Sequence, residues 1–166
     1  KIVFLVVALL FAISGIKYTE GNSHTEEFFT LGIFATIGMM FVASANDLMV
    51  LFVAFELASL ATYALAGFEK KNPRSLEAAM KYFIIGSLSA ALLLFGISYI
   101  YGATGTTSIP GVAANMEVLL SSPMGLVATV LLIAGFGFKI ALVPFHMWAP
   151  DTYQGAPSVV SALLAA

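Results

Sequence analysis

Long apolar runs alternate with short polar segments along this chain. The runs cover residues 2–16, 28–44, 48–68, 75–101 and 124–153, and a further one occupies 157–166. Crossing the hydrocarbon core of a bilayer takes about 20 apolar residues, and only helices and closed barrels satisfy their own backbone there. Because the runs are continuous rather than alternating, the pattern predicts an all-α, polytopic transmembrane helical bundle that forms a single domain over residues 1–166.

Polar residues beside the apolar runs predict several helix ends. Asn46 and Asp47 predict a tight turn whose aspartate caps the next helix, because a short acceptor side chain can bond the first free N–H groups. Ser75 is predicted to cap the fourth helix, with Glu77 in the first turn, where the helix dipole favours an acid. Pro157 predicts the start of a further helix, since proline is tolerated in a first turn.

The fifth run contains polar residues that a simple membrane span would lack. Pro144 has no N–H to offer the carbonyl of Ile140, so a helix arriving from residue 124 is predicted to break between Lys139 and Phe145. Lys139 then lies at the break. The freed carbonyls and the negative end of the arriving half-helix favour a cation there, and broken helices at membrane depth occur in protein or beside a water-filled cavity.

The connecting segments also carry information. Residues 102–123 are rich in glycine, threonine and serine and are predicted to be a loop, although 112–120 has the pattern of a short interfacial helix. Alternate sides of the membrane receive unequal charge, because Lys17, Lys70, Lys71 and Arg74 fall on one side and only Lys1 on the other. The side with more basic residues is predicted to be cytoplasmic.

The two ends of the sequence predict a piece of a longer protein. The chain starts at Lys1 without methionine and stops inside an apolar run. The first run has the basic start and apolar core of a signal peptide, but no small-residue cleavage site precedes a soluble domain. A membrane helix is therefore the better interpretation.

Composition supports the membrane prediction and excludes other classes. Hydrophobic residues make up 60% of the chain and charged residues 10%, and the mean hydropathy is +0.99; soluble domains carry roughly 25% charged residues. The net charge of -2, with no basic cluster flanked by aromatics, gives no case for nucleic-acid binding. There is no cysteine, and His24 and His146 are too few and too far apart for a histidine metal site, so no bound metal is expected.

Glu56 is the first charge that needs a reason. It lies eight residues into its predicted helix, or roughly 12 Å from one end of a hydrocarbon core about 30 Å thick. A lone carboxylate there costs several kcal/mol, so it must be protonated, paired with a cation or in contact with internal water. A titrating site on an ion path is favoured over a structural hydrogen bond, because serine or asparagine would provide the latter at a lower cost.

Lys139 is the natural partner of Glu56, since it too is expected near mid-depth. If the two are close, Glu56 favours the protonated lysine, and moving the carboxylate away favours release of that proton. A static buried ion pair is the alternative, but desolvation tends to cancel its Coulomb gain.

Three further polar residues leave alternatives open. Lys81 comes four residues after Glu77, so it either serves on the ion path or reaches the headgroups near a helix end. His146 is either a proton relay or a hydrogen-bonded packing residue. Asp151 is expected near the membrane edge in a cap or loop, and Trp148 is expected in an interfacial aromatic belt.

Several stretches resemble a known family. They are DLMVLFVAFELASLATYALAGFEK from Asp47, SLEAAMKYFIIGSLSAALLLFGISYIYGATGT from Ser75 and GFGFKIALVPFHMWAPDTYQGAPSVVSALLA from Gly135. The ordered set FELASL, EAAMKYF, FKIALVPFHMWAPD and YQGAP is similar to the antiporter-like membrane subunit N of the complex I family, the proton-pumping NADH:quinone oxidoreductases, with relatives in methanogen and chloroplast dehydrogenases and in multisubunit cation/proton antiporters. FELASLATYALAGF and PDTYQGAP look closer to subunit N than to its paralogues.

The resemblance implies specific roles. Glu56 matches the family's essential glutamate, Lys139 its lysine at a broken helix, Lys81 a further lysine that the family uses, and His146 a histidine of the same path. The family's next channel lysine matches a position beyond Ala166, and the second inverted repeat is also absent from this sequence. The chain is thus expected to hold the entry half of a proton path and not to pump alone.

The sequence therefore predicts a subunit of a translocase, a redox-driven NADH (or related donor):quinone oxidoreductase. It is expected to be a multi-pass protein of a prokaryotic cell membrane, or of an organelle inner membrane or thylakoid, in contact with lipid and other membrane subunits. The resemblance implies no cofactor on this chain, with quinone or a related carrier and the redox centres held in partner subunits. A multisubunit Na+/H+ antiporter and a structural membrane scaffold are the alternatives.

Overall fold

The computed structural model describes residues 1–166 and is built from nine helices. They are α1 (Ile2–Tyr18), α2 (Thr25–Val42), α3 (Leu48–Ala66), α4 (Pro73–Thr104), α5 (Ile109–Ala114), α6 (Met116–Ser121), α7 (Pro123–Lys139), α8 (Trp148–Gly155) and α9 (Ser158–Ala165). No strand forms, and the only extended pairing is an isolated bridge between Asp47 and Ser108.

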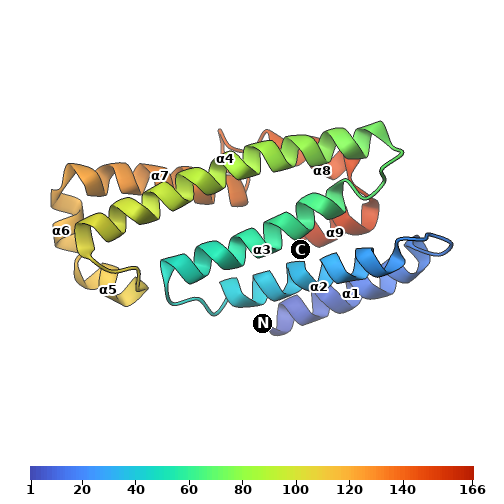
Figure 1. Cartoon of the computed structure of the whole chain (residues 1–166), viewed down its shortest axis with the longest axis horizontal. Helices are drawn as coiled ribbons and strands as arrows, with labels where there is room; N and C mark the ends of the chain where they lie inside the picture. The colour runs from blue at the N-terminus through green and yellow to red at the C-terminus, as the bar shows by residue number, and fades with distance from the viewer.

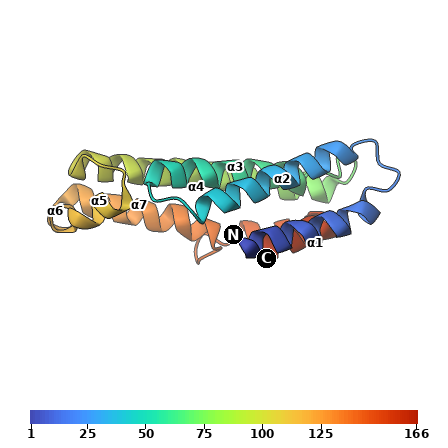
Figure 2. The same ribbon diagram turned by 90° about the horizontal axis from the view of Figure 1, so that it is seen from below.

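The long helices run along one another in an elongated bundle (Figure 1). Viewed from below, α2, α3 and α4 form one layer, while α1 and α7 lie in the other with α8 and α9 between them (Figure 2). In sequence order each long helix packs on its neighbour, and α4 also carries α7 and α8 along its length. This arrangement brings the middle of α3 close to the end of α7.

The outer surface of the bundle is apolar. Many of the large side chains that it exposes are aliphatic, including Ile2, Leu88, Leu120 and Leu126, each more than 60% exposed. Three helices, α2, α3 and α4, are long and apolar enough to cross a membrane, and α1 and α7 are shorter apolar helices. Because an exposed aliphatic surface of this extent suits lipid and not water, the predicted all-α transmembrane bundle is confirmed.

The cap predicted for α3 is confirmed, but the one predicted for α4 is wrong. Asp47 accepts hydrogen bonds from the N–H groups of Met49 at 2.8 Å and Val50 at 3.2 Å. The α4 helix is capped by Asn72 and begins at Pro73, so Glu77 lies beyond the first turn. Pro73 has the fixed φ that a first turn needs, and Asn72 before it supplies the acceptor.

Ser75 has a different role from the predicted cap. Its buried hydroxyl donates to the carbonyl of Ala66 at 2.7 Å. That carbonyl belongs to the last turn of α3, where it lacks a helical partner. Ser75 therefore satisfies the end of one helix from inside the next.

The segment predicted as a loop at 102–123 is mostly helical. The α4 helix continues to Thr104, and α5 and α6 follow as two short turns, so the expected helix at 112–120 is divided in two. The Thr107 hydroxyl donates to Asp47 at 2.6 Å and holds the pKa of that carboxyl below its usual range. The side chain that caps α3 thus also fixes the segment between α4 and α5.

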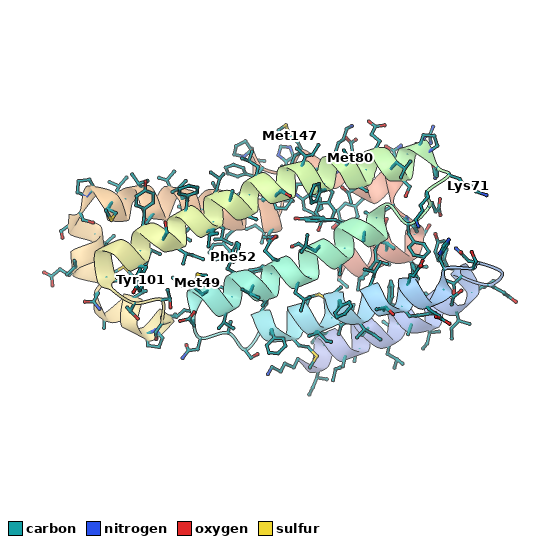
Figure 3. All side chains as sticks on the ribbon, in the orientation of Figure 1. Met49, Phe52, Lys71, Met80, Tyr101 and Met147 are labelled. Atoms are coloured by element: carbon teal, nitrogen blue, oxygen red, sulfur yellow. The ribbon has the colours of Figure 1, made fainter.

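The opposite end of the bundle joins two polar loops. Tyr18 donates to Oε1 of Glu69 and Asn72 donates to Oε2, each at 3.0 Å. These bonds place the α1–α2 and α3–α4 connections at one end, where Lys71 lies, while Tyr101 lies toward the other (Figure 3). The basic residues that the sequence assigned to one side are therefore grouped, and the cytoplasmic side remains a prediction.

A glycine allows α3 and α4 to approach closely. Gly86 faces the ring and hydroxyl of Tyr63, and a Cβ on Gly86 would overlap that hydroxyl. The Tyr63 hydroxyl is buried and makes no hydrogen bond. Small residues at helix contacts are typical of membrane bundles, because they let backbones come together without a void.

Candidate proton-transfer site

The break predicted between Lys139 and Phe145 is present. The α7 helix ends at Lys139, and regular helix resumes at Trp148. The N–H of Leu142 donates to Gly137 at 2.7 Å, one residue beyond the helical partner, and Ala141 has a φ of 51°. A left-handed conformation costs a non-glycine residue about 1–3 kcal/mol, so the surrounding structure must hold this turn in place.

One of those restraints is Trp148, whose predicted place in an interfacial belt is wrong. Its residue is only 5% exposed, and its indole N–H donates to the carbonyl of Phe138 at 3.1 Å. Its ring stacks on Tyr82 at 4.5 Å between centroids and lies 5.1 Å from Phe138. The first residue of α8 therefore binds the last turn of α7, as a second donor to a carbonyl that also accepts from Ala141 at 3.0 Å.

Glu56 and Lys139 lie together. Lys139 Nζ is 3.5 Å from Glu56 Oε1, and the two side chains are 11% and 22% exposed. Glu56 is near the middle of α3 and Lys139 is the last residue of α7. The pair expected from the sequence thus forms at the break, between residues that are 83 positions apart in the chain.

Ser59 also contacts Lys139, and sequence reasoning missed it. Its hydroxyl oxygen accepts from Nζ at 2.6 Å, a shorter contact than the one to Glu56. Ser59 follows Glu56 by three residues, so both point from the same face of α3. That spacing was the available signal, but a serine in an apolar helix often bonds only its own backbone.

Two aromatic rings complete the surroundings of the ammonium. Nζ lies 5.7 Å from the ring centre of Phe55 and 5.6 Å from that of Phe138. Rings at this distance attract a cation through their negative faces. The site therefore offers the Lys139 ammonium a carboxylate, a hydroxyl and two rings, which together stabilise its positive charge.

Lys81 forms a separate charged cluster. Its ammonium is 2.7 Å from Glu77 on the same helix and 2.6 Å from Asp151 in the first turn of α8. The cap or loop role predicted for Asp151 is therefore wrong. Asp151 is one half of a link between α4 and α8. Nothing local in the sequence indicates this pair, because 70 positions separate its members.

His146 is not brought to the Glu56–Lys139 pair. It lies in the non-helical segment between α7 and α8, its residue is exposed, and its side chain makes no hydrogen bond or ion pair. The packing role that the sequence left open for it is wrong. Its use as a relay stays a prediction.

The fold and site define a class. A lipid-exposed helical bundle with a buried acid–base pair at a broken helix has the features of an ion-translocating membrane protein of the antiporter-like type. Residues 45–166 match the family described as NADH:quinone oxidoreductase/Mrp antiporter, transmembrane. The chain belongs to this family.

Individual relatives agree with that assignment. The chain is 74% identical over its whole length to F(420)H(2) dehydrogenase subunit N of Methanosarcina mazei, of which it covers 34%. It is 48% identical, again over its whole length, to NADH-quinone oxidoreductase subunit N of Heliobacterium modesticaldum, of which it covers 35%. The chain thus spans about a third of the length of these relatives.

A solved structure has the same fold. A chain of respiratory complex I from Thermus thermophilus, determined with bound aureothin, superposes with a TM-score of 0.76 and 39% sequence identity. The match covers 98% of this chain and 37% of the other. The resemblance to subunit N inferred from sequence motifs is confirmed, and the protein is an integral membrane protein with several spans.

Proposed function

We propose that this chain is the first antiporter-like repeat of a proton-translocating membrane subunit. The subunit would serve a redox-driven NADH (or related donor):quinone oxidoreductase, and residues 1–166 would act in it as one transmembrane domain. The observation that carries the proposal is the Glu56–Lys139 contact at the break in α7. A buried acid and base in reach of one another can exchange an excess proton as their separation changes.

The step that this chain would perform is a proton transfer from Lys139 to the next acceptor on the path. With Glu56 near, the Lys139 ammonium is stabilised by the carboxylate, and a proton on Nζ is retained. When the carboxylate moves off, the charge is left beside two rings and one hydroxyl, and Nζ gives its proton to an acceptor further along the path. Because α7 is broken at this residue, the lysine can move without bending a continuous helix.

Lys81 and His146 would serve the same path at some distance. Lys81 precedes Tyr82, which contacts Tyr63, and Tyr63 lies seven residues or roughly 10 Å along α3 from Glu56. The Lys81 cluster would therefore stand between the central pair and the end of the bundle that holds the α3–α4 loop. His146 would accept or supply protons from the non-helical segment beside the break.

Redox chemistry would take place on other chains. The names of the relatives describe subunits of a dehydrogenase and of an NADH-quinone oxidoreductase. This chain would therefore work among other membrane subunits, with quinone or a related carrier and the redox centres bound in its partners. No redox cofactor is proposed for this chain itself.

The test is Glu56→Gln in the full-length protein within its assembled complex. In membrane vesicles, donor-driven proton uptake should fall at least about tenfold, because the neutral amide lacks the negative charge that stabilises the Lys139 ammonium. Glu117→Gln, on an exposed residue of α6, is the matched control and should leave uptake unchanged. Normal uptake in Glu56→Gln, at normal abundance, would instead favour a structural scaffold and overturn the proposal.

A subunit of a multisubunit Na+/H+ antiporter is the second candidate, since the family description includes such proteins. Sodium needs several oxygen ligands, whereas the oxygens of Glu56 and Ser59 face a lysine ammonium, which occupies the position that a cation would need. Proton uptake that requires sodium and continues without electron transfer would favour this candidate. Uptake that requires the electron donor and not sodium would exclude it.

A further inference from the structure

We infer that Ser59 is a positioning residue that holds the Lys139 ammonium away from the Glu56 carboxylate and so keeps their ion pair loose. The inference rests on the proposed function and names a residue that sets how readily Lys139 releases its proton. It arises from one geometric fact. The ammonium lies nearer to a neutral hydroxyl, at 2.6 Å, than to the carboxylate, at 3.5 Å.

That order of distances is unusual for a buried lysine beside a glutamate. Hydrogen bonds between an ammonium and a carboxylate are ordinarily about 2.7–2.9 Å long, because the opposite charges draw the atoms together. Here the carboxylate contact is at the outer limit of a hydrogen bond, while the uncharged partner holds the short one. Ser59 therefore competes with Glu56 for the same ammonium.

The backbone fixes the direction in which Ser59 acts. A serine hydroxyl has one proton to donate and lone pairs that accept. The Ser59 proton is given to the carbonyl of Phe55 at 2.7 Å, one turn earlier in α3. Its lone pairs therefore face Nζ, and the hydroxyl stabilises only the protonated lysine, with no proton of its own to exchange.

Burial makes the arrangement stable and effective. Ser59 is 6% exposed, so water does not replace it readily as an acceptor. Phe55 and Phe138 approach the ammonium as rings at 5.7 and 5.6 Å, which leaves Glu56 and Ser59 as its hydrogen-bonding partners. If Ser59 lost its oxygen, the ammonium would have one strong partner and would move onto the carboxylate.

The expected consequence is a tighter pair and slower transfer. Shortening the contact from 3.5 Å to about 2.8 Å, at an effective dielectric constant of about 20, increases the attraction enough to slow separation about sevenfold. Proton uptake should fall by a similar factor. If Ser59 were needed only for packing, replacing it would not change the distance between Lys139 Nζ and the Glu56 carboxylate.

The test compares variants of Ser59 in the full-length protein within the assembled complex. Ser59→Ala removes the acceptor, Ser59→Cys keeps the volume with a weak acceptor, and Ser59→Thr keeps the hydroxyl. Ser89→Ala is the matched control, because Ser89 is also buried and donates to a backbone carbonyl, that of Gly135 at 2.9 Å. Donor-driven proton uptake is measured in vesicles, and the distance from Nζ to the Glu56 carboxylate is measured in experimental structures of the variant complexes.

The inference predicts a shorter distance and about sevenfold lower uptake in Ser59→Ala and Ser59→Cys, with both restored in Ser59→Thr and both unchanged in Ser89→Ala. An unchanged distance in Ser59→Cys, whatever its uptake, would overturn the inference, and so would unchanged uptake at normal abundance. These results are separate from those that test the proposed function. If Glu56→Gln pumps normally, the proposed function fails, whereas a loss in Glu56→Gln with an unchanged distance in Ser59→Cys refutes only the role of Ser59.

Discussion

The hydrogen bond from Trp148 to the end of α7 gives a prediction that separates two ways of holding a broken helix. The indole N–H donates to the Phe138 carbonyl, and the indole ring lies against Tyr82 and Phe138. Trp148→Phe removes the donor and keeps an aromatic ring, whereas Trp148→Ala removes both. The two variants therefore divide the restraint into a polar part and a packing part.

The structure allows both effects to be estimated. The Phe138 carbonyl also accepts from Ala141 at 3.0 Å, so losing Trp148 Nε1 does not leave it unpaired. The loss should thus cost about 0.5–1.5 kcal/mol for a net hydrogen bond, with a further fraction for the smaller ring. Trp148→Ala should cost about 3–5 kcal/mol, because it empties a site that is only 5% exposed.

The measurements are the thermal stability of the assembled complex and donor-driven proton uptake in vesicles. Trp148→Phe should be nearly as stable as the parent protein and yet lose several-fold in uptake, since the carbonyl next to Lys139 is no longer fixed. Tyr153→Phe is the control. It removes an exposed hydroxyl bond of the same length, 3.1 Å to Leu164, and keeps the ring that stacks on Trp148 at 6.5 Å between centroids.

Two results would refute this reasoning. If Trp148→Phe and Trp148→Ala destabilise the protein equally, the hydrogen bond and not the ring dominates, and the packing estimate is wrong. If Trp148→Phe matches Tyr153→Phe in uptake, the N–H does not position the end of α7.

Two further predictions concern α4. Asp151→Asn should lower proton uptake several-fold, while Glu77→Gln should change it little, because both carboxylates bind Lys81 but only Asp151 links α4 to another helix; uptake in vesicles compares the two, and equal losses would argue that net charge and not the link matters. Gly86→Ala should reduce the amount of folded subunit in membranes several-fold, as an overpacked core loses roughly 1–3 kcal/mol. Gly102→Ala, where the nearest outside atom is 3.4 Å from the added Cβ, should accumulate normally, and equal amounts of both variants would contradict the packing argument.

Rules that act over a few residues predicted much of this fold. Continuous apolar runs gave the helices, Asp47 gave its cap, and Pro144 gave a break at Lys139. Each depends on a backbone group within four residues, so the chain neighbourhood contains the whole cause. The wrong cap predicted at Ser75 also has a local cause, because Asn72 directly before Pro73 is a better cap than Ser75.

Contacts between distant helices could not be predicted in the same way. Asp151 pairs with Lys81 across 70 positions, and Trp148 inserts between α4 and α7. Both residue types are also common at a membrane surface, so the sequence alone favoured that location. Ser59 is intermediate. Its position on the same face as Glu56 was visible, but its preference for Lys139 depends on how far α7 extends before it breaks.

The central pair combines both kinds of cause, which explains why its members were predictable but their geometry was not. A buried charge must find a partner, so Glu56 and Lys139 implied one another from depth alone. Their separation of 3.5 Å is instead set by two other residues: Ser59 attracts the ammonium, and Trp148 holds the turn that carries it. A proton-transfer site needs a pair that is close but not locked, and desolvation alone would not provide that, because two opposite charges in a medium of low dielectric close up unless something competes. The competing contacts are therefore as much a part of the site as the charges.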